Sequence, residues 1–154
     1  LMVYIICAVG FFLILFFFDN FLDRVLKRFM GLFGIGMGNA EFLSFELNAR
    51  KKLLIILIKN SGKESTRIAA IRCENEEGDF YYPIPYLSEE DLNCFTEKQA
   101  RLNFSKKLIK SNQELSVILN REELRSNNCQ SLAIMDAGGN SKDIPNFLQL
   151  VNAD

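Results

Sequence analysis

Residues 53–71 read LLIILIKNSGKESTRIAAI, two apolar runs separated by a short polar stretch that contains an Asn and a Gly. The first run, 53–59, is continuous and β-rich, as in a strand that is covered on both of its faces. The second run belongs to a segment that extends over 65–73. Two such runs on either side of an Asn/Gly turn predict a β-hairpin.

The sequence on both sides of this hairpin also indicates short strands. On the N-terminal side, Leu43, Phe45 and Leu47 alternate with polar residues in 40–47, as in a half-buried strand. Further strands are predicted over 77–87, 107–110, 114–119, 130–136 with a short return after 137–140, and 147–151. Seven or eight short strands in roughly 115 residues, with a turn signal after each, predict one β-sandwich domain.

Two short helices are expected between these strands. Ser88 precedes 89–95 and Asp91 follows it three residues later, a spacing similar to a capping box, so a helix is predicted that could extend to Arg101. Residues 121–124 predict a single helical turn.

The first 18 residues contain no charged side chain. As a helix they would rise about 27 Å, slightly less than the roughly 30 Å of a bilayer's hydrocarbon core. No basic residue precedes the run and no small-residue cleavage site follows it, so a cleaved signal peptide is not expected. The simpler alternative to a membrane helix is that residues 1–18 form a helix buried in a protein core.

Residues 19–33 continue this run with a different pattern. Apolar pairs alternate with polar pairs about every four residues, which predicts an amphipathic continuation of the same helix. Four Gly residues in 31–38 would end it. The sequence therefore divides into a hydrophobic and amphipathic helix (1–33), a Gly-rich neck (34–39) and a β-sandwich domain (40–154).

The orientation of such an anchor is left open by the sequence. Arg24, Lys27 and Arg28 follow the apolar run, which favours a cytoplasmic location for the domain by the positive-inside rule. The chain begins at Leu1 rather than Met, as would remain after removal of a short basic leader. In that case the charge bias before the helix would be missing from this sequence, and the positive-inside rule would not decide the orientation.

Composition argues against several classes of function. Lys and Arg number 18 and Asp and Glu 19, so the chain lacks the basic surplus of a nucleic-acid-binding protein. There is no His, the residue most used for acid–base catalysis and for metal ligation. No catalytic, cofactor-binding or metal-binding residues are assigned, and a non-enzymatic protein is expected.

Two local motifs are better interpreted structurally. The Gly-rich stretch 34–38 follows a predicted helix and lacks the Lys-Ser/Thr ending of a phosphate-binding loop. The acidic cluster within 74–79 lacks the ligand spacing of a calcium loop and is interpreted as a solvated turn. Cys73, Cys94 and Cys129 allow one disulfide if the domain is extracellular, or remain buried thiols if it is not.

Residues 80–86, FYYPIPY, are aromatic and rich in Pro. They could present a docking surface for a partner through Phe80, Tyr81, Tyr82 and Tyr86, or form an edge strand whose aromatic side chains belong to the core. The sequence Asn103-Phe-Ser matches a glycosylation acceptor, and one such match is expected by chance in an Asn-rich chain.

The whole chain resembles the type IV pilin-like proteins, particularly archaeal pilins and archaellins. The resemblance rests on the apolar N-terminal segment followed by a β-domain, and on residues 53–71, which are similar to the apolar strand, Asn-x-Gly turn and second strand of immunoglobulin-like domains in that family. It implies an α+β chain, with a long N-terminal hydrophobic helix followed by an all-β immunoglobulin-like sandwich of seven or eight strands. Ile5 stands where bacterial pilins usually carry Glu.

The resemblance also implies a structural role in a cell-surface filament. The N-terminal segment would leave the bilayer and pack with copies of itself, with the β-domain exposed, and no cofactor is implied. The residues expected to assemble the filament or anchor the chain are Ile5, Val9, Phe12, Leu13, Phe16, Phe17, Phe21, Leu22, Val25, Leu26 and Phe29. The alternative is a single-pass accessory subunit of a membrane complex whose β-sandwich binds a protein partner.

Overall fold

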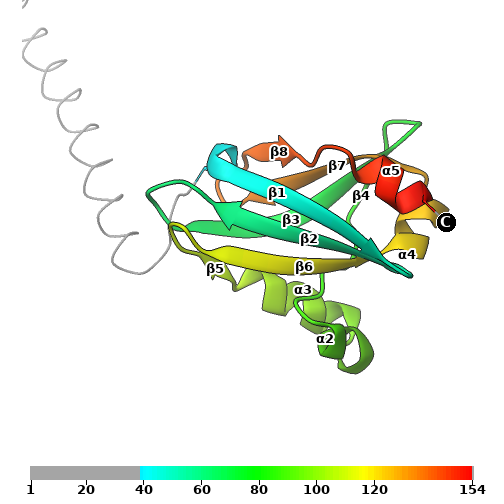
Figure 1. Ribbon diagram of the computed structural model, residues 1–154, viewed down its shortest axis with the longest axis horizontal. Helices are drawn as coiled ribbons and strands as arrows, with labels where there is room; N and C mark the ends of the chain where they lie inside the picture. The colour runs from blue at the N-terminus through cyan, green and yellow to red at the C-terminus, as the bar shows by residue number, and fades with distance from the viewer. Residues whose placement is uncertain (1–38, 154) are drawn as a thin grey trace, which may run out of the picture. The chain divides into compact units, whose positions relative to one another are not determined.

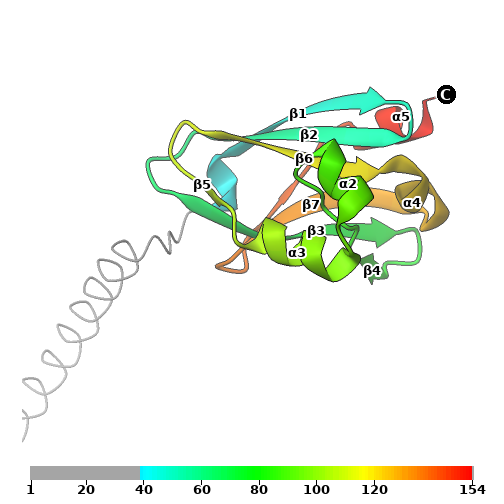
Figure 2. The ribbon, with the colours of Figure 1, turned by 90° about the horizontal axis from the view of Figure 1, so that it is seen from below.

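The structure, a computed structural model, describes residues 39–153, which form two antiparallel sheets packed face to face (Figures 1 and 2). The first sheet has the order β1-β2-β6, formed by Leu43–Arg50, Leu53–Asn60 and Glu114–Asn120. The second has the order β4-β3-β7-β8, formed by Phe80–Tyr81, Thr66–Asn75, Cys129–Asp136 and Ser141–Asp143. The short strand β5, Leu108–Ile109, pairs with the first two residues of β3.

Short helices occupy the connections between strands. They are the 3-10 helix η1 (Ala40–Phe42), α2 (Glu89–Cys94), α3 (Glu97–Ser105), α4 (Arg121–Ser126) and α5 (Phe147–Asn152). Ser88, Thr96 and Asn120 each begin a helix, since the side chain of each accepts a hydrogen bond from a first-turn backbone N–H. Local capping therefore sets where α2, α3 and α4 start.

The core lies between the two sheets and comes from alternate residues of their strands. In the first sheet, Leu54, Ile56 and Ile58 of β2 point inward and are fully buried. Ile71 and Ile134 lie opposite each other on β3 and β7 and are at most 1% exposed. Burial of these branched side chains is the main stabilising contribution to the fold.

The predicted hairpin between residues 53–59 and 65–73 is wrong. β2 pairs with β1 and β6, whereas β3 pairs with β4, β5 and β7, so the chain crosses from one sheet to the other between Asn60 and Thr66. The physical reason is that β2 and β3 each carry a row of apolar side chains that must be buried. Two sheets packed face to face bury both rows at once.

Asn60 directs this crossing. Its side chain is fully buried and donates from Nδ2 to the carbonyl oxygens of Glu64 (2.7 Å) and Ile109 (2.9 Å), while Oδ1 accepts from the Gly62 N–H (2.9 Å). The Asn60 backbone N–H donates to Gln113 (3.0 Å) and its carbonyl accepts from Asn112 (2.8 Å). One residue thus joins the end of β2, the crossing loop and the β5–β6 loop.

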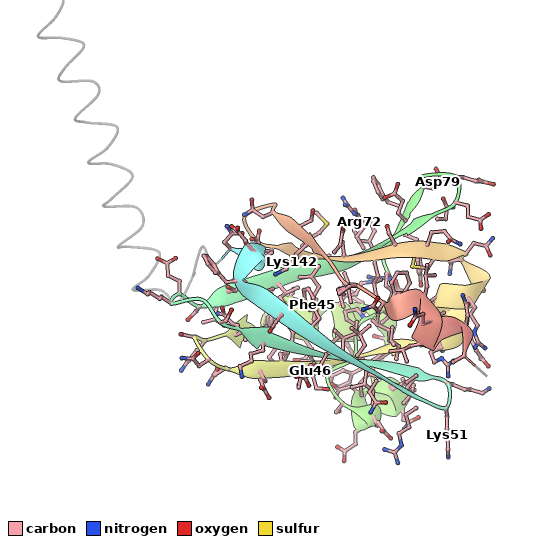
Figure 3. The ribbon with its side chains drawn as sticks, turned by 45° about the horizontal axis from the view of Figure 1, so that its top comes forward. Phe45, Glu46, Lys51, Arg72, Asp79 and Lys142 are labelled. Carbon is pink, nitrogen blue, oxygen red and sulfur yellow. A yellow bond between two sulfur atoms is a disulfide. The ribbon has the colours of Figure 1, made fainter. Side chains whose placement is uncertain are left out.

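A second contact ties the start of the domain to the opposite sheet. Asp136, at the end of β7, is 2% exposed and its Oδ2 accepts from the Ala40 N–H at 3.0 Å. On β8, Lys142 lies beside the start of β1 (Figure 3). Its amine donates to the carbonyls of Glu41 (2.7 Å) and Leu43 (2.6 Å). Lys142 therefore blocks the beginning of the unpaired edge of β1, a common protection of edge strands.

The Asp136 carboxylate is stabilised in its charged form. Burial raises the pKa of Asp136, but hydrogen bonds from the Ala40 N–H, from the Asn140 side chain and backbone, and from the Gly138 N–H outweigh burial and hold the pKa below its ordinary value of 3.8. All of these donors point at the carboxylate, which leaves it suited to holding the chain together rather than to binding a cation.

The predicted fold class, a long N-terminal helix followed by an all-β immunoglobulin-like sandwich, is corrected by the structure. Residues 39–153 are mostly strands in two antiparallel sheets, with several short helices and no long apolar helix among them. No helix in this range is long and apolar enough to cross a membrane. The helix predicted over 1–33 and the neck up to residue 38 lie outside the described residues.

Two smaller predictions are also corrected. The helix predicted from 89 to as far as Arg101 is two helices, because Phe95 is extended and Thr96 opens a new capping box with Gln99. The strand predicted over 147–151 is helix α5, because Phe147 and Val151 are four residues apart and both are buried, which fits one face of a helix. The predicted hairpin over 130–140 is confirmed by the pairing of β7 with β8.

We expect Asn60→Asp to destabilise the domain by at least about 3 kcal/mol, because a carboxylate oxygen would face two carbonyl oxygens in a buried site. Urea unfolding measures the loss. Asn48→Asp, at an exposed position of β1, is the matched control and should change the free energy of unfolding by less than about 0.5 kcal/mol. Equal effects of the two substitutions would contradict the role of Asn60.

Asp136 predicts a specific loss of stability in acid. Because its folded-state pKa is lowered, its contribution is fully present above the unfolded-state value and is lost as pH falls through the folded-state value. Asp136→Asn should cost about 1–3 kcal/mol at neutral pH and have a smaller effect in acid. Unfolding free energies of the wild type and the variant between about pH 2 and pH 7 test this, with Asp143→Asn on β8 as control.

Candidate interaction surface

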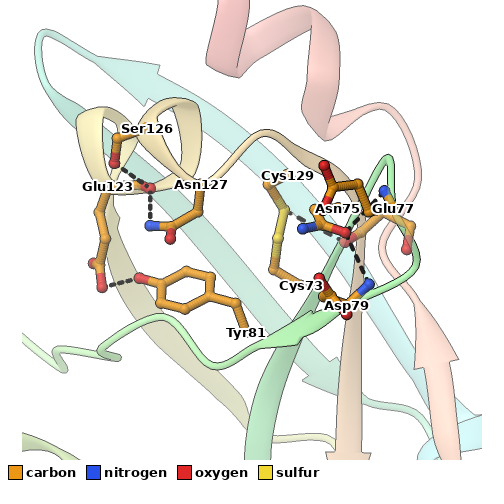
Figure 4. Close-up of a disulfide and its surroundings, with 10 residues drawn as sticks. Cys73, Asn75, Glu77, Asp79, Tyr81, Glu123, Ser126, Asn127 and Cys129 are labelled. Carbon is orange, nitrogen blue, oxygen red and sulfur yellow. Dashed lines mark hydrogen bonds between the residues drawn. A yellow bond between two sulfur atoms is a disulfide. The ribbon is translucent and has the colours of Figure 1, made fainter.

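The turn between β3 and β4 is held by one Asn side chain. Asn75 Oδ1 accepts from the backbone N–H groups of Glu77 (3.0 Å) and Asp79 (2.8 Å) (Figure 4). Gly78 adopts a φ of 84°, which side-chain-bearing residues rarely adopt. The acidic cluster of this segment is therefore a hairpin turn, and residues 39–153 contain no group of acidic, Cys or His side chains arranged to hold a metal ion.

A disulfide lies next to this turn. Cys73 of β3 and Cys129 of β7 are bonded, with their Cα atoms 5.7 Å apart (Figure 4). The sequence left the pairing open among three Cys residues, since only the fold reveals that Cys73 and Cys129 lie on neighbouring strands. Cys94 is exposed and has no disulfide partner among the Cys residues of 39–153.

The aromatic segment 80–86 runs from one sheet to the other. It begins as β4, paired to β3, and ends at Tyr86, which exchanges two backbone hydrogen bonds with Ile118 of β6. The Arg101 guanidinium of α3 donates to the carbonyls of Tyr82 (2.7 Å) and Pro83 (3.4 Å) between these ends. Pro83 and Pro85 are buried, and neither has a backbone N–H that could be left unpaired there.

Tyr81 and Tyr86 face a shared carboxylate. The Tyr81 hydroxyl donates to Glu123 Oε1 on α4 (Figure 4). Burial raises the pKa of Tyr81 far above its ordinary value, and the hydrogen bond and negative charge of Glu123 raise it further. Burial and Glu123 likewise raise the pKa of Tyr86. Both phenols therefore stay protonated near neutral pH, and the Tyr81 hydroxyl is the one that donates a hydrogen bond to Glu123.

Phe80 and Tyr82 are the parts of this segment that a partner can reach. Phe80 is 55% exposed and Tyr82 is 42% exposed, whereas Tyr81 and Tyr86 are half-buried. The Arg72 guanidinium lies over the Phe80 ring at 4.4 Å from its centroid. The predicted four-residue surface is thus divided into two exposed rings, Phe80 and Tyr82, and two half-buried rings, Tyr81 and Tyr86.

The remaining predicted residues lie in other places. Asn103 is half-buried on helix α3. The residues proposed for assembly or anchoring lie outside the described part of the chain: Ile5, Val9, Phe12, Leu13, Phe16, Phe17, Phe21, Leu22, Val25, Leu26 and Phe29.

Two surface hollows were missed by the sequence reading. One, of about 450 Å³, lies where residue 39 enters the domain, with the exposed Phe42 ring at its rim and the buried Asn60 and Thr66 in its lining. The other, of about 400 Å³, lies on the outer face of the first sheet beside Ile55 and Leu57. The sequence signal for the second hollow was the unbroken apolar run 53–58, because it leaves no polar residue among the outward-facing positions 53, 55 and 57 of β2.

Comparison with protein-family models, with curated proteins and with solved structures finds no match to this chain.

We expect replacement of both Cys73 and Cys129 by Ala to cost about 4 kcal/mol, because the bond closes a loop of 56 residues in the unfolded chain. Urea unfolding under non-reducing conditions measures the loss. Cys94→Ala should leave stability within about 0.5 kcal/mol of the wild type. A double variant as stable as the wild type would contradict a structural disulfide.

Proposed function

We propose that this chain is a non-enzymatic structural subunit of a cell-surface filament, similar to a type IV pilin. Its apolar N-terminal segment would mediate assembly with copies of the chain, and its β-domain would be exposed. The observation that carries the proposal is an uncharged run over residues 1–18 joined to a disulfide-bonded β-domain. Structural disulfides are typical of domains that fold outside the reducing cytoplasm.

The layout of the domain supports this proposal. Residue 39 enters at the end of the sandwich that carries η1, while the C-terminus and α4 lie at the opposite end (Figures 1 and 2). The disulfide and the Asn75 turn stabilise the end remote from residue 39. Such an arrangement suits a domain that is attached at one end and exposed at the other.

The alternative is a single-pass accessory subunit of a membrane complex. Arg24, Lys27 and Arg28 follow the apolar run and no charge precedes it, which favours a cytoplasmic domain. The exposed rings of Phe80 and Tyr82 would then bind a protein partner. A cytoplasmic domain would not be expected to keep the Cys73–Cys129 bond, so the redox state of these residues in cells discriminates between the two functions.

Electron microscopy of material sheared from the cell surface tests the filament proposal. Antibody against the domain should label fibres along their length. Fibres without label, or a chain that stays entirely in the membrane fraction, would contradict the proposal and favour the accessory subunit.

A charge within the apolar run should abolish assembly. We expect Val9→Glu or Leu13→Glu to remove the chain from sheared fibres, because a charge in an apolar environment costs about 3 kcal/mol or more. Circular dichroism should show an intact β-domain in these variants. Gln130→Glu, an exposed change on β7, is the matched control and should assemble normally. Polymerisation of residues 39–154 alone would show that the N-terminal segment is not the assembly element.

A further inference from the structure

The outer face of the first sheet is unusually apolar at its central strand. Leu53, Ile55 and Leu57 of β2 point away from the core, alternating with the inward-facing Leu54, Ile56 and Ile58. The outward residues of β2 are only half-buried. Outer faces of sandwich sheets ordinarily carry polar residues, so this apolar strip requires an explanation.

Other elements of the domain contact this sheet at its margins. At one end, Glu89 of α2 approaches Arg50 of β1 (3.5 Å), and Tyr86 pairs with Ile118 beside β2. No described helix or strand lies over the outer face of the middle of β2 (Figures 1 and 2). The hollow of about 400 Å³ found there is lined by residues of β1, β2 and β6 alone: Glu46, Leu47, Asn48, Ile55, Leu57 and Ser116.

The rim of this hollow carries an acidic charge. Lys59 and Glu114 form an ion pair (3.6 Å) at the end of the strip beyond Leu57. Glu46 is exposed and, within residues 39–153, has no basic side chain within ion-pair distance. An occupant should therefore combine apolar side chains for Ile55 and Leu57 with a cation for Glu46.

We infer that this hollow binds residues 19–33 of a second copy of the chain. That segment places the basic residues Arg24, Lys27 and Arg28 among the apolar pairs Phe21/Leu22, Val25/Leu26 and Phe29/Met30. Residues 19–33 thus provide the apolar side chains for Ile55 and Leu57 and the cation for Glu46, and the contact would join two copies of the chain. The inference rests on the proposed function and extends it by assigning a docking surface on the β-domain.

Photo-crosslinking of the full-length chain in cells tests the inference. The photoreactive residue p-benzoylphenylalanine replaces Asn48 at the rim, or Ser131 on the outer face of the second sheet as a control. We expect Asn48 to give a dimer-sized adduct that maps to residues 19–33, and Ser131 to give none. An adduct from Asn48 to another protein or to another part of the chain, or no adduct at all, would overturn the inference.

Charge reversal tests the role of Glu46. Glu46→Lys should lower the yield of the Asn48 adduct about fivefold, the factor that corresponds to about 1 kcal/mol. Adding Lys27→Glu or Arg28→Glu to the same chain should restore the yield. An unchanged yield in Glu46→Lys, or no restoration by either second substitution, would overturn the charge pairing.

The outcome of this experiment is separate from that of the filament test. Fibres that contain the chain without the adduct would leave the filament proposal intact and refute the docking surface. An adduct in cells without labelled fibres would support the contact between copies and refute the filament.

Discussion

The fold depends on the buried side chain of Asn60. At the point where β2 ends, the chain has to leave one sheet and enter the other without leaving polar groups unpaired. Asn60 meets this requirement by binding the carbonyls of Glu64 and Ile109 and the N–H of Gly62, while its own backbone groups bind residues 112 and 113. A buried amide with every group paired fixes the geometry of a crossing more strictly than apolar packing can. The relative position of the two sheets follows from it.

The opposite side of the sandwich is closed by charged groups that hydrogen-bond to the backbone. Asp136 receives the Ala40 N–H, and Lys142 donates to two carbonyls at the start of β1. At the other end of the domain, the buried Arg121 donates to the carbonyls of Lys51, Val151 and Ala153, and so ties α5 to the β1–β2 turn. These contacts explain why the ends of β1 are protected although β1 is an edge strand.

The candidate surface shows where sequence reasoning reached its limit. The composition of residues 80–86 shows that they are aromatic and rich in Pro, but it could not distinguish a ring that faces solvent from a ring that faces Glu123. β4 exposes Phe80 and turns Tyr81 inward, because successive side chains of a strand point to opposite faces. The Cys73–Cys129 bond was likewise one of several pairings allowed by the sequence. The hollow beside Ile55 and Leu57 was not identified, because the apolar run of β2 was interpreted as a strand covered on both faces.

The sequence by itself determined where most strands lie and where α2 and α4 begin, because alternation of apolar residues and capping by Ser88 and Asn120 act over a few neighbouring residues. It also determined the uncharged character of residues 1–18 and the lack of His. Only the tertiary structure decided that β2 and β3 belong to different sheets, that residues 147–152 form a helix, and which Cys residues pair. These features depend on contacts between residues far apart in the chain, such as Asn60 with Ile109 and Ala40 with Asp136. The physical reason is that a local pattern fixes which face of a strand is apolar, whereas the element that covers this face is chosen by the packing of the whole domain.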